Sequence, residues 1–444
     1  MKVSWLILLP LTGALAVALL RRWRVPMLIA TLLTLLGFLR LSSALPLDQA
    51  ELFLEQTWLL DAGARHLLTL SCWATLALLA IAATAPQADA VHAPVLASLG
   101  LLSAAVLLRS WLLSLLLLPA ALIVPVMATF PMRRSAPRGA AQYLAWVTLP
   151  IPFLLPIPWL LDQLSVHPQE LAVVAWSAWL VLPAWVLWLN LFPFHGTMPL
   201  WAAAGPPLAP AFLWAVKDGV AIYLLLGLWR QIPALQTQTV LSTLQLLGLL
   251  TALFSGVWAV LQTHLSGVLG CAAMAVLGLI VQGLTSASTD SMSPAWFLLL
   301  SRSALVLMST AALTALPGRS RHSEGARAQR FPWEGLVLWL ISIAGVLALL
   351  RLPSVNDPTL GRSALALLQA REPRLWQAWR ISAAGILIGL AHTGWRLWRD
   401  RVRHSAGRIR PVPFGLAVAF FLLCLYLARS PQLVAGWLSG LLPF

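Results

Sequence analysis

Charged residues are scarce in this sequence. They make up 10% of its 444 residues, whereas hydrophobic residues make up 60%. A water-soluble globular protein is not built from such a composition. Apolar runs of about 20 residues, long enough to cross a bilayer, follow one another along the chain. The short alternating segments of a membrane β-barrel do not occur, and a helix satisfies its own backbone hydrogen bonds in lipid. The composition therefore predicts an all-α polytopic membrane protein.

Cysteines and recognisable cofactor motifs are also rare. The three cysteines (Cys72, Cys271 and Cys424) lie in apolar stretches without CxxC spacing, so they predict neither a metal site nor a disulfide framework. The sequence contains no ATP-binding loop, no GxGxxG site and no cluster with metal-ligand spacing. We therefore expect no cofactor and no metal, and no redox or nucleotide chemistry carried out by the chain itself.

Acidic residues are few, 14 against 29 basic ones, which gives a net charge of +15. The arginines gather in loops between apolar runs, as the positive-inside rule describes, so we expect lipid and not nucleic acid as the partner. About fourteen spans are predicted by length and flanks. They are 4–20, 26–46, 65–85, 92–108, 110–130, 140–161, 170–192, 209–229, 238–260, 265–286, 292–315, 333–370, 378–398 and 413–429.

The loop charges predict the orientation of these spans. Strongly basic loops at 21–24, 132–138, 318–330 and 395–410 all follow odd-numbered spans, and the acidic loop at 48–56 follows the second span. Basic loops stay on the cytoplasmic side. The chain is therefore expected to be a multi-pass protein of the cell inner membrane with both termini outside the cytoplasm.

Lysine is nearly absent, since Lys2 and Lys217 are the only two in the chain. Lys217 and the adjacent Asp218 lie inside the apolar run 212–226. A lysine at the middle of a membrane helix costs about 2.5–3.5 kcal/mol on insertion scales, which favours a functional role over snorkelling to an interface. Neighbouring residues point about 100° apart around a helix. Asp218 could therefore neutralise Lys217 through water or face a different partner.

Proline and glycine gather just before this run, in LFPFHGTMPLWAAAGPPLAPAF at 191–212. The prolines expected to break the helix are Pro193, Pro199, Pro206 and Pro207. Such a segment between two apolar helices predicts a discontinuous helix, whose free backbone groups line a polar or protein-buried cavity. His195 lies in the break, either as a proton relay or as a histidine with satisfied hydrogen bonds.

These residues carry a resemblance to a known family. The matching positions are Pro193, His195, Pro199, Pro206, Lys217, Gly219, Tyr223 and Arg230. Together they resemble the broken-helix signature of the antiporter-like, proton-translocating subunits of respiratory complex I (NADH-quinone oxidoreductase), multisubunit cation/proton antiporters and membrane-bound hydrogenases. Stretches 247–278 and 350–368 resemble two further motifs of that family. Lys217 stands two positions early relative to Tyr223, so either a bulge absorbs the offset or the register differs.

The resemblance implies a fold of about fourteen transmembrane helices with two inverted five-helix repeats and broken helices near 186–210 and 345–368. It also implies four segments. These are N-terminal helices at 1–90, a first repeat at 91–230, a second repeat at 231–375 and C-terminal helices at 376–444.

In the family, a row of buried charges crosses the membrane. The resemblance places Ser114 and Trp188 at two positions of that row, and neither side chain can carry a buried charge. Lys217 retains the lysine of a third position. Arg362 occupies a fourth, where a guanidinium stays protonated. With His264 at an acidic position of the motif in 247–278, the expected proton pathway is Lys217, Asp218, His195, Arg362 and His264. His392, alone in its span, is expected to be structural.

The resemblance implies a membrane subunit of a complex I-like oxidoreductase that contributes to proton translocation beside other membrane subunits, with redox subunits on the cytoplasmic side. The chain would be at most a non-redox subunit of such an enzyme. Two alternatives stay open: a degenerate structural paralogue that does not pump, or a subunit of a cation/proton antiporter or a membrane-bound hydrogenase. An unrelated transporter or a polyprenyl-type membrane enzyme would need a pocket of acidic residues facing water, whereas the interior acids here amount to Asp218.

The predicted orientation can be measured with reporter fusions. Fusions at Ser135, Gly325 and Arg403 should report a cytoplasmic location, because each lies in or beside a basic loop. A fusion at Leu52 should report the opposite side, and a cytoplasmic signal there would refute the orientation.

Overall fold

The computed structural model describes most of the chain up to Thr285 and one long helix near its C-terminal end. The described residues are 3–83, 86–127, 137–157, 159–160, 163, 171–204, 208–285, 299, 302–303, 306–307, 309–311 and 373–403. Several sequence predictions fall outside them: Arg362, Pro206, Pro207, the second broken helix near 345–368 and the predicted spans 333–370 and 413–429.

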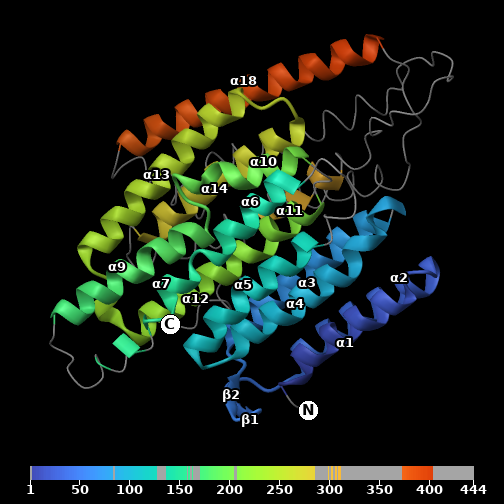
Figure 1. Ribbon diagram of the computed structural model, residues 1–444, viewed down its shortest axis with the longest axis vertical. Coiled ribbons are helices and arrows are strands. Elements are labelled where there is room, and N and C mark those ends of the chain that lie inside the picture. Colours follow the sequence, from blue (N-terminus) through green and yellow to red (C-terminus); the bar gives the residue numbers. More distant parts are fainter. Residues whose placement is uncertain are drawn as a thin grey trace, which may run out of the picture. The chain divides into compact units, whose positions relative to one another are not determined.

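The contacts divide the chain into two compact units. Unit 1 comprises Met1–Thr197, Phe212–Leu247 and Gly436–Phe444, and unit 2 comprises Met198–Ala211 and Gly248–Ala435. Figure 1 shows both units as bundles of helices, together with a small hairpin near the N-terminus. Each unit is described separately below.

Unit 1 begins with helices that follow the predicted apolar runs closely. They are α1 (Trp5–Leu20), α2 (Arg24–Ala44), α3 (Ala62–Ala83), α4 (His92–Leu107), α5 (Trp111–Met127), α6 (Pro137–Thr148), α7 (Ile151–Leu154) and α9 (Leu171–Trp188), with the short η1 (Pro86–Val91). α4 is central to this group, because it packs against α1, α3 and α5 and also contacts α12 (Asp218–Gln231). The predicted span 140–161 is interrupted after Thr148, and Pro150 is the cap residue just before the separate α7.

The remaining helices lie around the predicted break and beyond it. They are η3 (Phe194–Gly196), α10 (Thr197–Ala204), α11 (Leu208–Phe212), the π-helical turn η4 (Leu213–Lys217), α12, η5 (Pro233–Leu235), α13 (Gln238–Val260), α14 (Leu265–Thr285) and α18 (Pro373–Arg403). α11, η4 and α12 run on without a gap from Leu208 to Gln231.

Six of the described helical segments are long and apolar enough to cross a membrane. They are Arg24–Ala44, Ala62–Ala83, Asp89–Leu107, Leu208–Gln231, Gln238–Val260 and Leu265–Thr285. The chain is therefore a polytopic helical membrane protein, whereas the count of fourteen spans and the two repeats stay predictions. α18, which contains the predicted span 378–398, is not among the six, so its crossing also stays a prediction.

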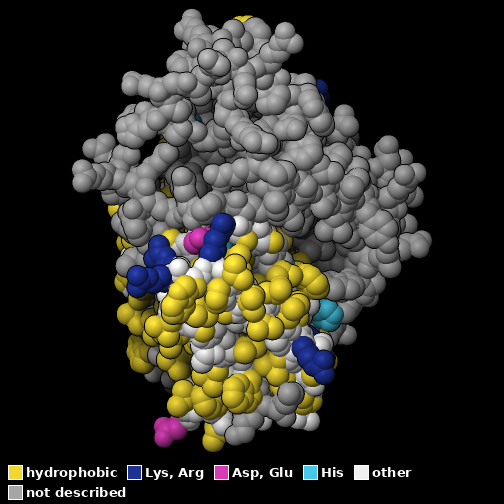
Figure 2. Space-filling view, turned by 90° about the vertical axis from the view of Figure 1, so that its right-hand side faces the viewer, with side chains coloured by type: hydrophobic (Ala, Val, Ile, Leu, Met, Phe, Trp, Pro, Cys, Tyr) yellow, Lys and Arg dark blue, Asp and Glu magenta, His cyan; other side chains and the backbone are white. Residues whose placement is uncertain are grey.

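The surface of the described part suits a lipid environment. Figure 2 shows one face that is mostly hydrophobic, with a few lysine or arginine side chains towards its margins. α2 contributes several large exposed side chains, among them Leu32, Leu33 and Leu36. A soluble monomer rarely exposes so large a contiguous apolar surface, but lipid covers one at no cost.

A two-stranded antiparallel hairpin corrects the expectation of a purely helical chain. β1 (Ala50–Phe53) pairs with β2 (Gln56–Leu59) within the predicted acidic loop. Its turn residues Leu54 and Glu55 have φ angles of 53° and 60°, the left-handed values of a type I′ turn. Such turns usually contain Asn-Gly, so Leu-Glu gave no sign of a hairpin. Glu51 of this hairpin accepts hydrogen bonds from the backbone N–H groups of Val3 and Ser4, just before α1.

Unit 2 is held together by close contacts between small residues. In the part of α13 from Gly248 onward, a Cβ atom on Gly248 would lie 2.8 Å from the carbonyl oxygen of Gly278 in α14. A Cβ on Gly278 would lie 2.8 Å from the backbone nitrogen of Ala252. Further along, Gly256 of α13 packs directly against Ser382 and Gly385 of α18. Small residues spaced in this way let membrane helices approach until their backbones touch.

This packing can be tested with a matched pair of substitutions. Gly278→Ala should lower the thermal midpoint of unfolding in detergent by several degrees, because overpacking of a close backbone contact costs about 1–3 kcal/mol. Gly37→Ala is the control, since its added methyl would meet only the tip of the Leu9 side chain at 3.2 Å. Equal midpoints for the two variants would contradict the contact between α13 and α14.

Candidate functional site

The site begins where α9 ends. Asn190 has a φ of 51°, a left-handed value that asparagine tolerates better than most residues. Its backbone N–H donates to the carbonyl of Leu187 at 3.1 Å, and the N–H of Leu191 donates to the carbonyl of Val186 at 2.8 Å. This pair of bonds is a Schellman cap, which satisfies two of the last four carbonyls of the helix. The buried carbonyl of Trp188 still requires a donor from elsewhere.

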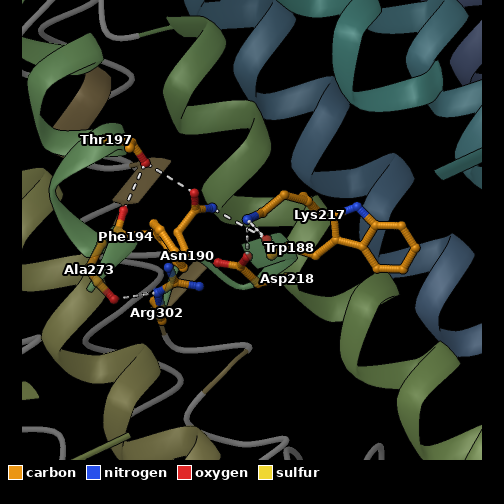
Figure 3. Close-up of polar contacts among 8 residues, drawn as sticks. All are labelled: Trp188, Asn190, Phe194, Thr197, Lys217, Asp218, Ala273 and Arg302. Atoms are coloured by element: carbon orange, nitrogen blue, oxygen red, sulfur yellow. Dashed lines mark hydrogen bonds and ion pairs between the residues drawn. The ribbon is translucent and has the colours of Figure 1, made fainter. Parts of the chain in front are cut away.

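Lys217 supplies that donor. Its Nζ donates to the carbonyl oxygen of Trp188 at 2.5 Å, and the side-chain amide of Asn190 donates to the same oxygen at 3.3 Å (Figure 3). The carboxyl end of a helix carries a partial negative charge, which favours an ammonium group at this position. The lysine predicted to be functional therefore lies at the end of the helix that the sequence predicted to break.

Asp218 forms a direct ion pair with Lys217. The two side chains are each 1% exposed, and Nζ lies 2.8 Å from Oδ1 (Figure 3). Of the two arrangements left open by the sequence, the direct contact is the one observed. The π-helical turn η4 ends at Lys217, so the helix is locally widened where the two side chains begin. The pair has no net charge, which lowers the penalty for holding it away from water.

The π-helical turn also bears on the register offset of Lys217. A π-helical turn holds one more residue than an α-helical turn, and such bulges occur frequently at functional sites. The turn lies at Leu213–Lys217, before the lysine, and the chain from Asp218 to Tyr223 is regular α-helix. It therefore does not account for the two-residue offset between Lys217 and Tyr223, and the register stays a prediction.

The break itself is closed by side-chain hydrogen bonds. Thr197, the first residue of α10, donates from Oγ1 to Oδ1 of Asn190 at 3.1 Å and to the carbonyl of Phe194 at 3.0 Å (Figure 3). Trp146 of α6 packs its ring against Phe194 with 4.4 Å between the ring centroids. Asn190 thus contacts the end of α9 on one side and the start of α10 on the other.

The predicted prolines and His195 lie in and after this break. Pro193 follows Phe192 through a cis peptide bond, and Pro199 lies in the first turn of α10, where a missing N–H leaves no intrahelical bond unmade. His195 is buried in η3, and its ring stacks on Phe192 with the centroids 5.7 Å apart. Its role in proton transfer stays a prediction.

The other predicted positions have different surroundings. Ser114 is buried in α5, where its hydroxyl donates to the carbonyl of Leu108 at 3.1 Å. His264 is exposed between α13 and α14, and its carbonyl accepts the N–H groups of Gly267 and Val268 at the start of α14. His392 is half-buried in α18. Trp188 belongs to the site through its backbone carbonyl, which any residue would provide.

Sequence reasoning missed three polar residues of structural importance. Asn190 and Thr197 hold the break, and the sequence feature that could have indicated them is a polar residue on each side of Pro193. Arg302, fully buried in unit 2, donates from Nε to the carbonyl of Ala273 at 2.8 Å (Figure 3). The sequence could have indicated Arg302 because it is an arginine within an apolar run. It was overlooked because arginines were interpreted as loop residues.

Comparison with known proteins identifies the fold. The sequence matches no protein-family model, and no curated protein is significantly similar to it. The structure resembles a chain of respiratory complex I from Thermus thermophilus with a TM-score of 0.75 and 18% identity, over 99% of this chain and 98% of that one. A chain of the Mrp complex from Dietzia sp. DQ12-45-1b gives a TM-score of 0.74 at 15% identity, over 99% and 97% of the two chains.

A third similar structure is a chain of the membrane-bound sulfane sulfur reductase, an archaeal respiratory membrane complex. Its TM-score is 0.71 at 15% identity, and the similarity covers 99% of this chain and 96% of that one. All three similarities extend over nearly the whole length of both chains. The predicted resemblance to the antiporter-like subunits is therefore confirmed at the level of the fold.

The role of Asn190 can be tested with two substitutions that separate its backbone from its amide. Asn190→Gly keeps the left-handed conformation and loses only the amide hydrogen bonds, whereas Asn190→Ala also forces a Cβ into an unfavourable region. Thermal unfolding should show the alanine variant to be less stable than the glycine variant by about 1 kcal/mol. An alanine variant as stable as the glycine variant would show that the left-handed cap is not formed.

Proposed function

We propose that the chain is a membrane subunit of a complex I-like oxidoreductase and contributes to proton translocation through the Lys217–Asp218 pair. The observation that carries this proposal is the fully buried ion pair at the end of a broken helix. Ionisable residues inside a membrane are expensive to hold there and commonly mark ion or proton pathways. The fold shared with chains of respiratory complexes supports the setting.

The chemistry of the pair suits one exchangeable proton. With Lys217 protonated and Asp218 ionised, the site is neutral. When Asp218 accepts a proton, the site gains one positive charge, which remains on Lys217. The Trp188 carbonyl and the carboxyl end of α9 then stabilise that charge, because both present partial negative charge to the ammonium group. Release of the proton from Asp218 restores the neutral pair, so the site cycles between two states.

Other residues would bias this cycle. His195, buried in the same break, is proposed as a relay, and Arg362 as a fixed positive charge that favours proton release. His264 is less suited to a buried pathway than the sequence suggested, because it is exposed. The partners proposed are other membrane subunits, with redox subunits on the cytoplasmic side of the inner membrane.

A structural role is the second candidate, and it too has an observation in its favour. Ser114 and Trp188 cannot titrate, although the resemblance places them at positions of the charged row. If the role is structural, the ion pair would hold α12 against the end of α9 without carrying protons. A place in a cation/proton antiporter is a further alternative, favoured by the similarity to a chain of the Mrp complex.

Substitution of the pair tests the proposal. Proton translocation should be measured in inverted membrane vesicles containing the assembled complex, with assembly checked on native gels. Lys217→Met leaves an unpaired buried acid and is expected to weaken folding by about 3–5 kcal/mol. The double variant Lys217→Met, Asp218→Asn removes both charges together and avoids that penalty.

We expect the double variant to assemble and to lose proton translocation. Lys217→Arg with Asp218 intact is the control, because a guanidinium keeps the positive charge that remains at this position throughout the cycle, and it should assemble and retain proton translocation. Wild-type translocation by an assembled double variant would establish the structural role instead.

A further inference from the structure

A second polar contact in unit 1 joins the helix of the ion pair to the start of another span. Tyr223 of α12 donates from its hydroxyl to Oδ2 of Asp61 at 2.9 Å. Asp61 directly precedes α3, close to the end of the β1–β2 hairpin. We propose that Asp61 and Tyr223 form the terminal relay through which the Lys217–Asp218 pair exchanges protons with the aqueous side at which α3 begins. This inference rests on the proposed function.

Asp61 is placed between water and the helix bundle. It is partly exposed, whereas the side chains of Lys217 and Asp218 are 1% exposed. Its Oδ1 accepts the N–H of Ala64 at 2.5 Å, so one carboxylate oxygen caps α3. The other oxygen faces Tyr223. A cap uses only one of the two oxygens, and the second can therefore accept and pass on a proton.

Tyr223 lies on the same helix as the ion pair. It follows Lys217 by six residues, about 9 Å along the helix axis. At about 100° per residue, the side chains of Asp218 and Tyr223 point about 140° apart around α12. The step between them is therefore assigned to a chain of bridging water molecules.

A cation lies near this contact. Arg230, exposed near the end of α12, lies two turns beyond Tyr223 and acts on it electrostatically. The hydroxyl of Tyr223 therefore has a cation farther along α12 and the Asp61 carboxylate as its acceptor.

The proton balance of one release is simple. Tyr223 gives its hydroxyl proton to the Asp61 carboxylate and receives one from Asp218 through bridging water. Asp218 returns to the carboxylate form, Tyr223 is unchanged, and Asp61 loses the proton to bulk water. Uptake follows the same steps in reverse. No other reactant is required, and each group ends in the state in which it began.

The alternative is that this contact only fastens α12 to α3. Small-acid rescue separates the two roles. Asp61→Ser keeps an N-cap but removes the carboxylate and leaves a small space. Formate can enter that space and carry protons in place of the missing side chain, whereas it cannot replace a fastening between two helices.

The measurement is proton translocation by the assembled complex in vesicles. Asp61→Ser should reduce the rate about tenfold or more, in line with the loss of a proton-transfer group, and formate should restore a large part of it. Tyr223→Phe, which keeps the ring and the cap, should show a similar loss without rescue by formate. The double variant should be no slower than either single variant, because both residues serve one route.

Asp48→Asn is the matched control. Asp48 is an exposed acid at the same end of unit 1, and asparagine suits its left-handed φ of 58°. This variant should translocate at the wild-type rate, and the wild type with formate corrects for permeation of formic acid. A Tyr223→Phe complex at the wild-type rate would overturn the relay, as would an Asp61→Ser complex that formate does not restore. If the variants of the ion pair abolish translocation while those of Asp61 and Tyr223 do not, the relay fails and the proposed function stands.

Discussion

The end of α9 is the constraint on which the site depends. Inside a membrane no bulk water satisfies the last carbonyls of a helix, so a helix that stops there needs donors from the protein. The Asn190 cap satisfies two of them, and the ammonium of Lys217 satisfies the carbonyl of Trp188. Lys217 in turn needs an anion, which Asp218 provides. A break in one helix thus explains why the next span contains both a cation and an acid.

Each unit has its own packing of helices. In unit 2, contacts around Gly248, Gly256 and Gly278 bring helix backbones together without bulky side chains. Dispersion then supplies the stability that burial of apolar surface cannot supply in lipid. In unit 1, α4 has a similar central place, and it contacts the helix that bears the ion pair. The ion pair therefore lies on a helix that packs against the central helix of its own unit.

Much of the fold could be predicted because lipid imposes long apolar runs. The expected spans 238–260 and 265–286 match α13 and α14 almost to the residue. The prolines indicated the break before Lys217. The apolar residues on both sides of Lys217 indicated that this lysine is buried. The direct pairing of Lys217 with Asp218 was not predictable. Side chains of adjacent residues point about 100° apart on a regular helix, and the residues LWAVK have no feature that indicates a π-helical turn. The cap at Asn190 and the turn at Leu54–Glu55 were missed because each uses a left-handed conformation without glycine.

The adjacency of Lys217 and Asp218 in the chain has a consequence for how the protein enters the membrane. A pair brought together only by folding would require two separate helices to cross with unmatched charges. Here one helix bears both residues, so the ion pair between them cancels these two charges within that helix. Each ionised residue alone would add about 2.5–3.5 kcal/mol to insertion. The span can therefore leave the translocation machinery independently, and the order in which the helices assemble need not be dictated by its charges.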